Sequence, residues 1–447
     1  MLDEYYGNVI KLLSKETGFP TRGLETLLNY YFCTKSKIMQ QTTYKIYRYR
    51  WIVLLAFMLV VIMNQLLWIT YAPITSSAAG YYQVSDLSIG LLSMCFMIVY
   101  ILISLPASWV IDTYGMKTAV GIGAVLTGVF GLLRGMAGSN YTLALLAQVG
   151  IAIGQPFILN AITKIAARWF PVNERATASG LGTLAMYAGI FLGISMTPYI
   201  TIALGIGKML FIYGIISAVF AAAFFALARE NPPTPPCSPE QEKRSLVFEG
   251  LKQALNKRQF ILLMIIFFIG LGVFNAVTTW IENIVGPRGF SITQAGMTGG
   301  LMIVGGIAGA LVIPALSDRY RKRVPFILLS LAGATIGLAG VTFATAYWLL
   351  LASAFAMGFF LLSAGPIGFQ YGAEVTHPAP EGTTNGLLLL MGQISGIGFI
   401  IGMDSFKSAA TGSMTIPLIV LCGLMALSLL LSGFLKESAL LKGIENR

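Results

Sequence analysis

Polar and aromatic side chains recur at helical spacing inside apolar sequence, and their types are those that bind small solutes. Asn64, Trp68 and Tyr71 stand at positions i, i+4 and i+7, so an α-helix places an amide, an indole and a phenol on one face. A cation over the indole would gain roughly 0.5 to 2 kcal/mol. Interhelical hydrogen bonding for the amide and interfacial anchoring for the indole are the alternatives.

Two later apolar runs offer similar groups. One helical face carries Asn275, Thr278, Thr279 and Glu282. Another run carries Ser363, Gln370 and Tyr371, with Gly365 and Pro366 as an expected bend. Polar side chains are costly in lipid unless they meet each other or water, so we expect these faces to point to the bundle interior or a wet cavity.

Acidic residues stand near the ends of the apolar runs rather than at their centres. Those expected at the cytoplasmic ends are Asp112, Asp318 and Glu374, and those expected near the outer ends are Asp86, Glu282 and Asp404. Because ion coupling usually needs a carboxylate inside the membrane, this distribution predicts a facilitator driven by the gradient of its solute. Glu282 would overturn that prediction if it faced the cavity.

Catalytic and metal-binding constellations are not expected. His377 is the single histidine, and it lies in an expected loop, where a solvated residue is more common than a catalyst. The four cysteines are scattered without a CxxC pair, which predicts neither disulfides nor a metal site. We therefore expect no enzyme activity and no cofactor.

Apolar runs long enough to cross a bilayer recur along the chain and predict an all-α membrane protein. Of its 447 residues, 56% are hydrophobic and 11% are charged, well below the charged fraction of a soluble protein. We expect twelve transmembrane helices at about 51–78, 86–110, 118–137, 142–165, 177–202, 207–228, 259–282, 293–316, 325–345, 347–371, 383–403 and 414–435.

An internal repeat divides these helices into two six-helix bundles. Asp112 and Asp318, each close to the end of an apolar run, are 206 residues apart, and Glu174 and Glu381 are 207 apart. Two landmarks at nearly one offset predict pseudo-symmetric halves. The expected domains are a cytoplasmic segment (1–50), the first bundle (51–228), a proline-rich cytoplasmic linker (229–258), the second bundle (259–436) and a cytoplasmic tail (437–447).

Basic residues are concentrated on one side of this arrangement. Of the 29 Lys and Arg residues, 25 fall on the side shared by both termini, and the others are Arg134, Lys208, Arg288 and Lys407. This asymmetry predicts that both termini are cytoplasmic. It also explains the net charge of +11 without a nucleic-acid partner. We expect a monomer in the lipid bilayer of the plasma (inner) membrane.

The loop motifs resemble those of the major facilitator superfamily. Asp112-x-x-Gly115-x-Lys117 is similar to its signature between helices 2 and 3, and Asp318-Arg319 begins a second copy in which Arg321 replaces the usual glycine. Pro171-x-x-Glu174-Arg175 resembles its loop 4–5 signature. The resemblance implies the major facilitator fold. We expect gating residues that pair across the two halves and with helix dipoles: Asp112, Lys117, Arg168, Glu174, Arg175, Asp318, Arg319, Glu374 and Glu381.

A narrower resemblance concerns the solute. The sequences around Asn64 to Tyr71, Gly154-Gln155-Pro, Ala167-Arg168-Trp169 and Glu381 to Gln393 are similar to the feline leukaemia virus subgroup C receptor-related family. That family comprises facilitators linked to choline and ethanolamine, with haem also proposed. The resemblance implies a cavity in which Trp68 faces an ammonium and Gln155 and Gln393 line the wall. Asn275 stands where that family has the helix 7 aromatic that completes the cage.

These features together predict a transporter of a small polar or cationic organic solute that works by alternating access. The expected substrate-binding residues are Asn64, Trp68, Tyr71, Gln155, Asn275, Thr279, Gln370 and Gln393. A choline- or ethanolamine-like amine is the leading substrate. The alternatives are proton-coupled transport of another metabolite or drug, and a membrane receptor or scaffold without transport activity.

Overall fold

The computed structural model describes residues 45–234, 252–377, 379 and 381–437, and all the regular structure in these ranges is helical. The first half contains α3 (Arg50–Ile69), η1 (Ala72–Ile74), α4 (Thr75–Tyr82), α5 (Asp86–Tyr114), α6 (Met116–Met136), α7 (Tyr141–Leu159), α8 (Ile162–Trp169), α9 (Val172–Leu204) and α10 (Ile206–Leu227). The second contains α12 (Arg258–Thr279), α13 (Ile281–Val285), η2 (Gly286–Arg288), α14 (Ile292–Tyr320), α15 (Val324–Phe343), α16 (Tyr347–Thr376), α17 (Glu381–Ser405) and α18 (Thr415–Ser432). Nearly all of the predicted N-terminal segment and tail, and most of the linker, lie outside the described residues.

Twelve helical stretches in these ranges are long and apolar enough to cross a membrane, which confirms the predicted number. The first and fourth spans each consist of more than one helix. The first span breaks after Ile69, and Pro73 follows, which lacks the N–H group that would continue the helix. The fourth span turns at Asn160 and Ala161, between α7 and α8.

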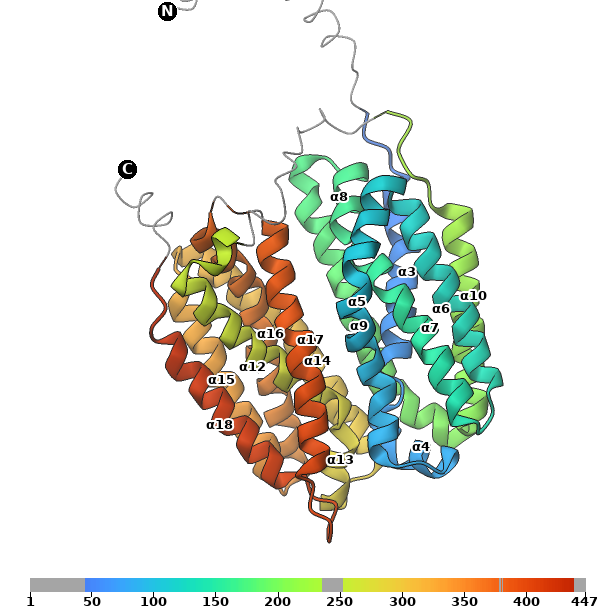
Figure 1. Ribbon diagram of the computed structural model, residues 1–447, viewed down its shortest axis with the longest axis vertical. Coiled ribbons are helices and arrows are strands. Elements are labelled where there is room, and N and C mark those ends of the chain that lie inside the picture. The colour runs from blue at the N-terminus through green and yellow to red at the C-terminus, as the bar shows by residue number, and fades with distance from the viewer. Residues whose placement is uncertain (1–44, 235–251, 378, 380, 438–447) are drawn as a thin grey trace, which may run out of the picture.

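The twelve spans form two bundles, α3 to α10 and α12 to α18 (Figure 1). We call the end that carries Arg50, Glu230 and Arg258 the linker end, because the chain passes between the bundles there. We call the opposite end, with α4 and α13, the α4–α13 end. The main contacts between bundles join α9 to α14 and α5 to α17.

The same carboxylate cap occurs once in each bundle, at the linker end. Glu230, just after α10, accepts hydrogen bonds from the backbone N–H groups of Met116 and Lys117, at 3.0 and 2.6 Å. Glu437, just after α18, accepts from Arg323 and Val324, at 3.0 and 2.9 Å. Each carboxylate therefore satisfies free N–H groups at the start of a helix and lies at the positive end of its dipole.

The repeat extends to the residues around these caps. Glu230 and Glu437 are 207 residues apart, the same offset as the loop motifs. An aromatic side chain donates to the carbonyl before each cap: Trp169 Nε1 to Arg229 at 3.2 Å, and the Tyr371 hydroxyl to Lys436 at 2.8 Å. These polar contacts pin the last span of each half to its third and fourth spans.

The motif glycine and its counterpart in the second copy of the signature both have a positive φ. Gly115 has a φ of +90°, and a Cβ there would lie 2.4 Å from the Glu230 carboxylate. In the second copy Arg321 adopts the left-handed conformation, with a φ of +53°. Gly115 has a ψ of 171° and Arg321 a ψ of 35°, so the second loop follows a different path, and a residue with a side chain adopts its left-handed conformation at an energetic cost.

Removing either cap should lower stability to a similar extent. In Glu230→Gln and Glu437→Gln, we expect the free energy of unfolding to fall by about 1 kcal/mol each, because a charged acceptor at a helix start is lost. Equilibrium unfolding in mixed micelles measures this, with Lys257→Gln at the exposed start of α12 as the control. A loss in only one of the two variants would show that the caps are not equivalent.

Candidate functional site

The two bundles are joined by polar contacts at the α4–α13 end. Asp86 begins α5, where the helix dipole favours a negative charge. Its Oδ2 accepts from Asn283 Nδ2 of α13 and from Lys407 Nζ just after α17, both at 2.9 Å. Lys407 also lies 3.4 Å from Asp404. One carboxylate of the first bundle thus holds two elements of the second.

Glu282 makes a second polar contact across the bundles. Its carboxylate accepts from the backbone N–H of Ser76 at 2.8 Å, in the first turn of α4, and the residue is only 6% exposed. Burial raises the pKa of Glu282 above its ordinary value of 4.5, and the negative charge of Asp86 raises it further, while the Ser76 N–H group partly opposes the shift. We call these contacts of Asp86, Lys407, Asn283, Glu282 and Ser76 the latch.

Apolar contacts continue the join along the adjoining parts of the helices. A Cβ on Gly90 of α5 would lie 2.9 Å from the indole ring of Trp280. Similarly, Gly300 of α14 leaves room for Ser195 of α9, and Gly396 of α17 leaves room for Met97 of α5. Small residues therefore let the helices of opposite bundles approach closely, as is usual in membranes.

At the linker end the described ion pairs stay within a bundle. Arg50 pairs with Glu174 at 3.0 Å and Lys164 with Asp112 at 2.9 Å in the first half. Arg323 pairs with Glu374 at 3.1 Å in the second. Among the ion pairs described, Asp112, Glu174 and Glu374 thus pair with a base of their own bundle rather than across the halves.

Other expected gating residues have individual environments at this end. Arg168 donates to the Asn231 side chain at 3.3 Å, Arg175 donates to the Phe170 carbonyl at 3.4 Å, and Arg323 rather than Arg319 meets Asp318. The Glu381 side chain lies outside the described atoms. Gly180 of α9 and Gly386 of α17 have open space beside them as far as described residues are concerned. The gating role of this set stays a prediction.

Two of the expected substrate-binding residues, Asn64 and Tyr71, use their polar atoms in hydrogen bonds inside the first bundle. Asn64 is fully buried, and its amide donates to Thr127 Oγ1 at 3.1 Å and to the Ile151 carbonyl at 3.4 Å. The hydroxyl of the fully buried Tyr71 lies 3.0 Å from that of Tyr82. For these two side chains, the alternative of interhelical or local hydrogen bonding describes the structure better than exposure to a cavity.

Trp68, Asn275 and Gln393 lie along the contact between bundles. Trp68 is 7% exposed, and its indole N–H donates to the Ser93 carbonyl of α5 at 3.2 Å. One turn further along α5, Met97 lies beside Gly396, which also adjoins the Asn275 amide. Asn275 donates to the Gly392 carbonyl at 3.2 Å, next to Gln393. These contacts therefore link Trp68 to Asn275 through α5 and α17, and Gln393 is half-buried on α17 beside Gly392, whose carbonyl accepts the Asn275 hydrogen bond.

The remaining expected residues differ in what their polar atoms can reach. Gln155 of α7 is 6% exposed, and its amide has no described hydrogen-bond partner but keeps some access to the surroundings. No described contact joins Gln155 to Trp68 or Gln393. The Thr279 hydroxyl is buried without a described partner. Gln370 is exposed and donates to Glu374 at 3.1 Å, so it belongs to the linker end.

Comparison with known proteins places the chain in a family. The sequence model of the Major Facilitator Superfamily matches residues 53–400. The chain is 31% identical over 378 residues to solute carrier family 49 member A3 of Xenopus tropicalis, covering 80% of this chain and 78% of that protein. The chain belongs to the major facilitator superfamily, within solute carrier family 49. It is therefore a multi-pass membrane transporter.

More distant relatives agree with this placement in the major facilitator superfamily. The human choline/ethanolamine transporter FLVCR2 is 26% identical over 420 residues, covering 88% of this chain and 78% of that protein. Among solved structures, a bacterial homologue of the lysosomal transporter Spinster, described as inward-facing and unoccupied, matches with a TM-score of 0.71 at 18% identity. That match covers 87% of this chain and 98% of the bacterial chain and shows the shared major facilitator fold.

Arg134 is a residue of this major facilitator chain whose role the sequence did not reveal. It is fully buried in the last turn of α6, and its guanidinium donates to the Leu67 carbonyl at 2.9 Å and to Gln148 Oε1 at 2.6 Å. The guanidinium lies 5.4 Å from the Tyr71 ring centre. No carboxylate of the described residues pairs with it. The signal available was a charged residue and a glutamine within two consecutive apolar runs.

The partners of Arg134 explain how a buried cation is tolerated. Leu67 is close to the end of α3, where unpaired carbonyls carry the negative end of the helix dipole. The guanidinium thus ties α6 and α7 to the turn of α3 that bears Trp68. Arg134 acts as a positioning residue for this turn, rather than as a simple determinant of topology.

Replacing Arg134 should disturb the fold and the Trp68 turn together. In Arg134→Met, we expect the free energy of unfolding to fall by about 3 kcal/mol, because the Leu67 carbonyl and Gln148 lose charged donors. Equilibrium unfolding and Trp68 fluorescence report the two effects. If Arg134→Met and Gln148→Met had additive effects in a double-mutant cycle, the two side chains would not be coupled as the structure indicates.

Glu282 should make closure of the α4–α13 end depend on pH. Because its pKa is raised when the latch is closed, the closed form binds the extra proton. Closure should therefore strengthen as pH falls toward 4.5 and weaken as pH rises through the raised value. Spin-label distances between Gly80→Cys and Ala410→Cys measure closure, in a background with the native cysteines replaced.

Glu282→Gln is the matched variant for this pH effect. The amide keeps a hydrogen-bond acceptor for Ser76 but cannot titrate, so we expect a distance distribution that no longer changes with pH in this range. Asp86, Asp404 and Lys407 are the charged neighbours, and Asp404→Asn serves as the control. An unchanged pH response in Glu282→Gln would assign the effect to another group.

Proposed function

We propose that this chain transports a small polar or cationic organic solute down its gradient by alternating access. An amine related to choline or ethanolamine is the leading substrate. The observation that carries the proposal is the neutral, polar and aromatic neighbourhood of Trp68, Asn275 and Gln393 at the contact between two bundles. Bundles that rock about such a contact expose it first to one side and then to the other.

The uneven contact between the bundles supports the alternating-access part of the proposal. The latch and the glycine contacts join the bundles at and near the α4–α13 end, while the described ion pairs of the linker end stay within each bundle. If the basic side is cytoplasmic, as the distribution of Lys and Arg indicates, the linker end faces the cytoplasm. The described conformation would then be closed to the outside and open inward.

The neutral side chains of the site support a polar or cationic solute that does not need a negatively charged partner. Trp68 supplies an aromatic face for an ammonium, and the amides of Gln155, Asn275 and Gln393 supply donors and acceptors. The relatives named choline/ethanolamine transporters include FLVCR2 of human at 26% identity. Because Asn275 supplies an amide rather than an aromatic ring, hydrogen bonds to the solute should contribute more here than they would in a complete aromatic cage.

The positions of the acidic residues support the facilitator part. Among the described residues, Asp112, Glu174, Asp318 and Glu374 lie at the linker end, and Asp86, Glu282 and Asp404 at the other end. A proton carrier would have to be reachable from both sides of the membrane. Glu282 titrates within the latch, so it would modulate closure without carrying a proton across.

Solute-dependent stabilisation of the purified protein tests the proposal. We expect choline or ethanolamine to raise the melting temperature of the wild type, since a ligand of the native state stabilises it. Trp68→Ala should weaken the apparent affinity about threefold to thirtyfold, and Trp68→Phe less, because a ring face remains. Uptake into liposomes with and without a solute gradient, at constant pH, measures transport.

Matched variants separate a site effect from a general one. Trp348→Ala, at a side chain that is 72% exposed, is the control for losing a tryptophan. Gln155→Leu and Gln393→Leu should each reduce affinity, while Gln370→Leu at the linker end should not. If only solutes of another class stabilised the protein, that class would replace choline and ethanolamine as the proposed substrate. A failure of every solute in amine, vitamin and small-acid libraries would favour a receptor or scaffold.

A further inference from the structure

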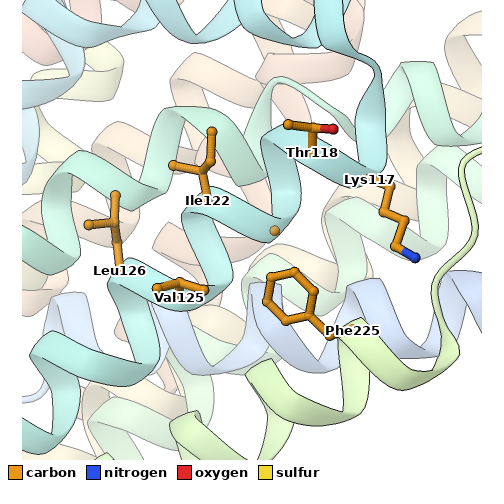
Figure 2. Close-up of a pocket in the computed structure, with 7 residues that line it drawn as sticks. Lys117, Thr118, Ile122, Val125, Leu126 and Phe225 are labelled. Atoms are coloured by element: carbon orange, nitrogen blue, oxygen red, sulfur yellow. The ribbon is translucent and has the colours of Figure 1, made fainter.

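A groove lies between α6 and α10, on the side of the first bundle away from the second. It has a volume of about 480 Å³ and is lined by Lys117, Thr118, Ile122, Val125, Leu126 and Phe225. Figure 2 shows the Phe225 ring of α10 facing α6, with Lys117 at the end of the groove where α6 begins. The cationic end of the groove therefore lies at the linker end.

A missing side chain creates the space. Gly121 also lines the groove, and a Cβ at that position would lie 3.1 Å from the Phe225 ring. Thr118, Ile122 and Val125 follow at helical spacing and are exposed, so the groove lies on the surface of α6 rather than in the bundle core.

The surroundings of the groove indicate lipid chains as its environment. Exposed apolar side chains continue from it along both helices, at Val129 and Leu133 of α6 and at Ile215 and Val219 of α10. In a membrane-spanning protein such a continuous apolar face meets the acyl chains of the bilayer. A polar solute would find only the Lys117 ammonium and the Thr118 hydroxyl to bind.

Lys117 gives this apolar groove a cationic end. Its side chain is half-buried, and its ammonium has no acidic partner within the described parts of the chain. The nearby Glu230 carboxylate is engaged by the backbone N–H groups of Met116 and Lys117. A free ammonium at the membrane surface attracts anionic headgroups.

We propose that this groove binds an anionic phospholipid from the leaflet at the linker end. An acyl chain lies along Gly121 and Phe225, and the phosphate meets Lys117 Nζ with the Thr118 hydroxyl as a second donor. The second bundle supplies an internal comparison, because Val324 and Leu328 stand 207 residues after Lys117 and Gly121. By this alignment an apolar residue replaces the lysine and a leucine replaces the glycine, and the neighbouring Arg323 is paired with Asp318 and Glu374.

Quenching of a tryptophan in the groove by a brominated lipid tests this site. Phe225→Trp places the reporter in the groove, and the parent chain with its six tryptophans gives the background. In phosphatidylcholine nanodiscs, a minor fraction of brominated phosphatidylglycerol should quench the reporter more than the same fraction of brominated phosphatidylcholine. Lys117→Gln should reduce that preference about fivefold, the effect of one lysine near a membrane surface.

Three controls decide whether the groove itself is responsible. Lys257→Gln removes a charge elsewhere at the linker end and should leave the preference intact. Leu329→Trp, at the position equivalent to Ile122 in the second bundle, should be quenched equally by both lipids. If Phe225→Trp does not fold, Ile122→Trp reports from the opposite wall.

The contrary outcomes are distinct. Equal quenching of the Phe225→Trp reporter by the two lipids would overturn the proposal, as would an equal loss in Lys257→Gln and Lys117→Gln. Displacement of the brominated lipid by inorganic phosphate would identify free phosphate as the ligand instead. These readouts do not depend on transport, so they stand apart from the proposed solute.

Discussion

The hydrocarbon of a bilayer offers no hydrogen-bond partner, so a polar group that this chain places in the membrane is costly unless it finds a partner within the protein. Arg134 is the clearest case, since it carries a full charge into the first bundle. One of its terminal nitrogens donates to the Leu67 carbonyl and to Gln148, near the end of a helix whose carbonyls are otherwise unpaired, while its buried Nε has no described partner. The same constraint draws Asn64 to Thr127 and Tyr71 to Tyr82.

This constraint also separates packing residues from residues that remain free for a solute. Asn64 and Tyr71 were expected on one helix face with Trp68, but α3 ends at Ile69, before Tyr71, and the polar atoms of both residues are used within the first bundle. Gln155, by contrast, has no described hydrogen-bond partner for its amide. A binding residue in such a protein is therefore recognised by the polar capacity that the fold leaves unused, and less by its type alone.

The two ends of the molecule use charge differently. At the linker end, the ion pairs and caps described, such as those of Glu174, Glu374, Glu230 and Glu437, join elements of one bundle. At the α4–α13 end, Asp86 and Glu282 accept hydrogen bonds from the opposite bundle. Contacts that hold each half together need not break when the halves rock, whereas the latch must, which suits its small number of hydrogen bonds.

Local pattern was sufficient for much of the architecture. Hydrophobic runs predicted twelve spans, and the offset of 206 to 207 between loop motifs predicted the repeat, which the Glu230 and Glu437 caps follow. Each run or motif consists of residues close in sequence, and the bilayer thickness fixes the length of a span. These features can therefore be predicted without the tertiary structure.

Which residues pair with one another, in contrast, could be determined only from the packed tertiary structure. Asp86 and Lys407 are 321 residues apart, and Asp86 and Asn283 are 197 apart, so neither separation follows the repeat or marks these residues as partners. That the Lys117 ammonium has no acidic partner among the described residues is likewise known only once its neighbours are placed. Burial and hydrogen bonding are decided by which helices touch, and that information is not carried by any single segment.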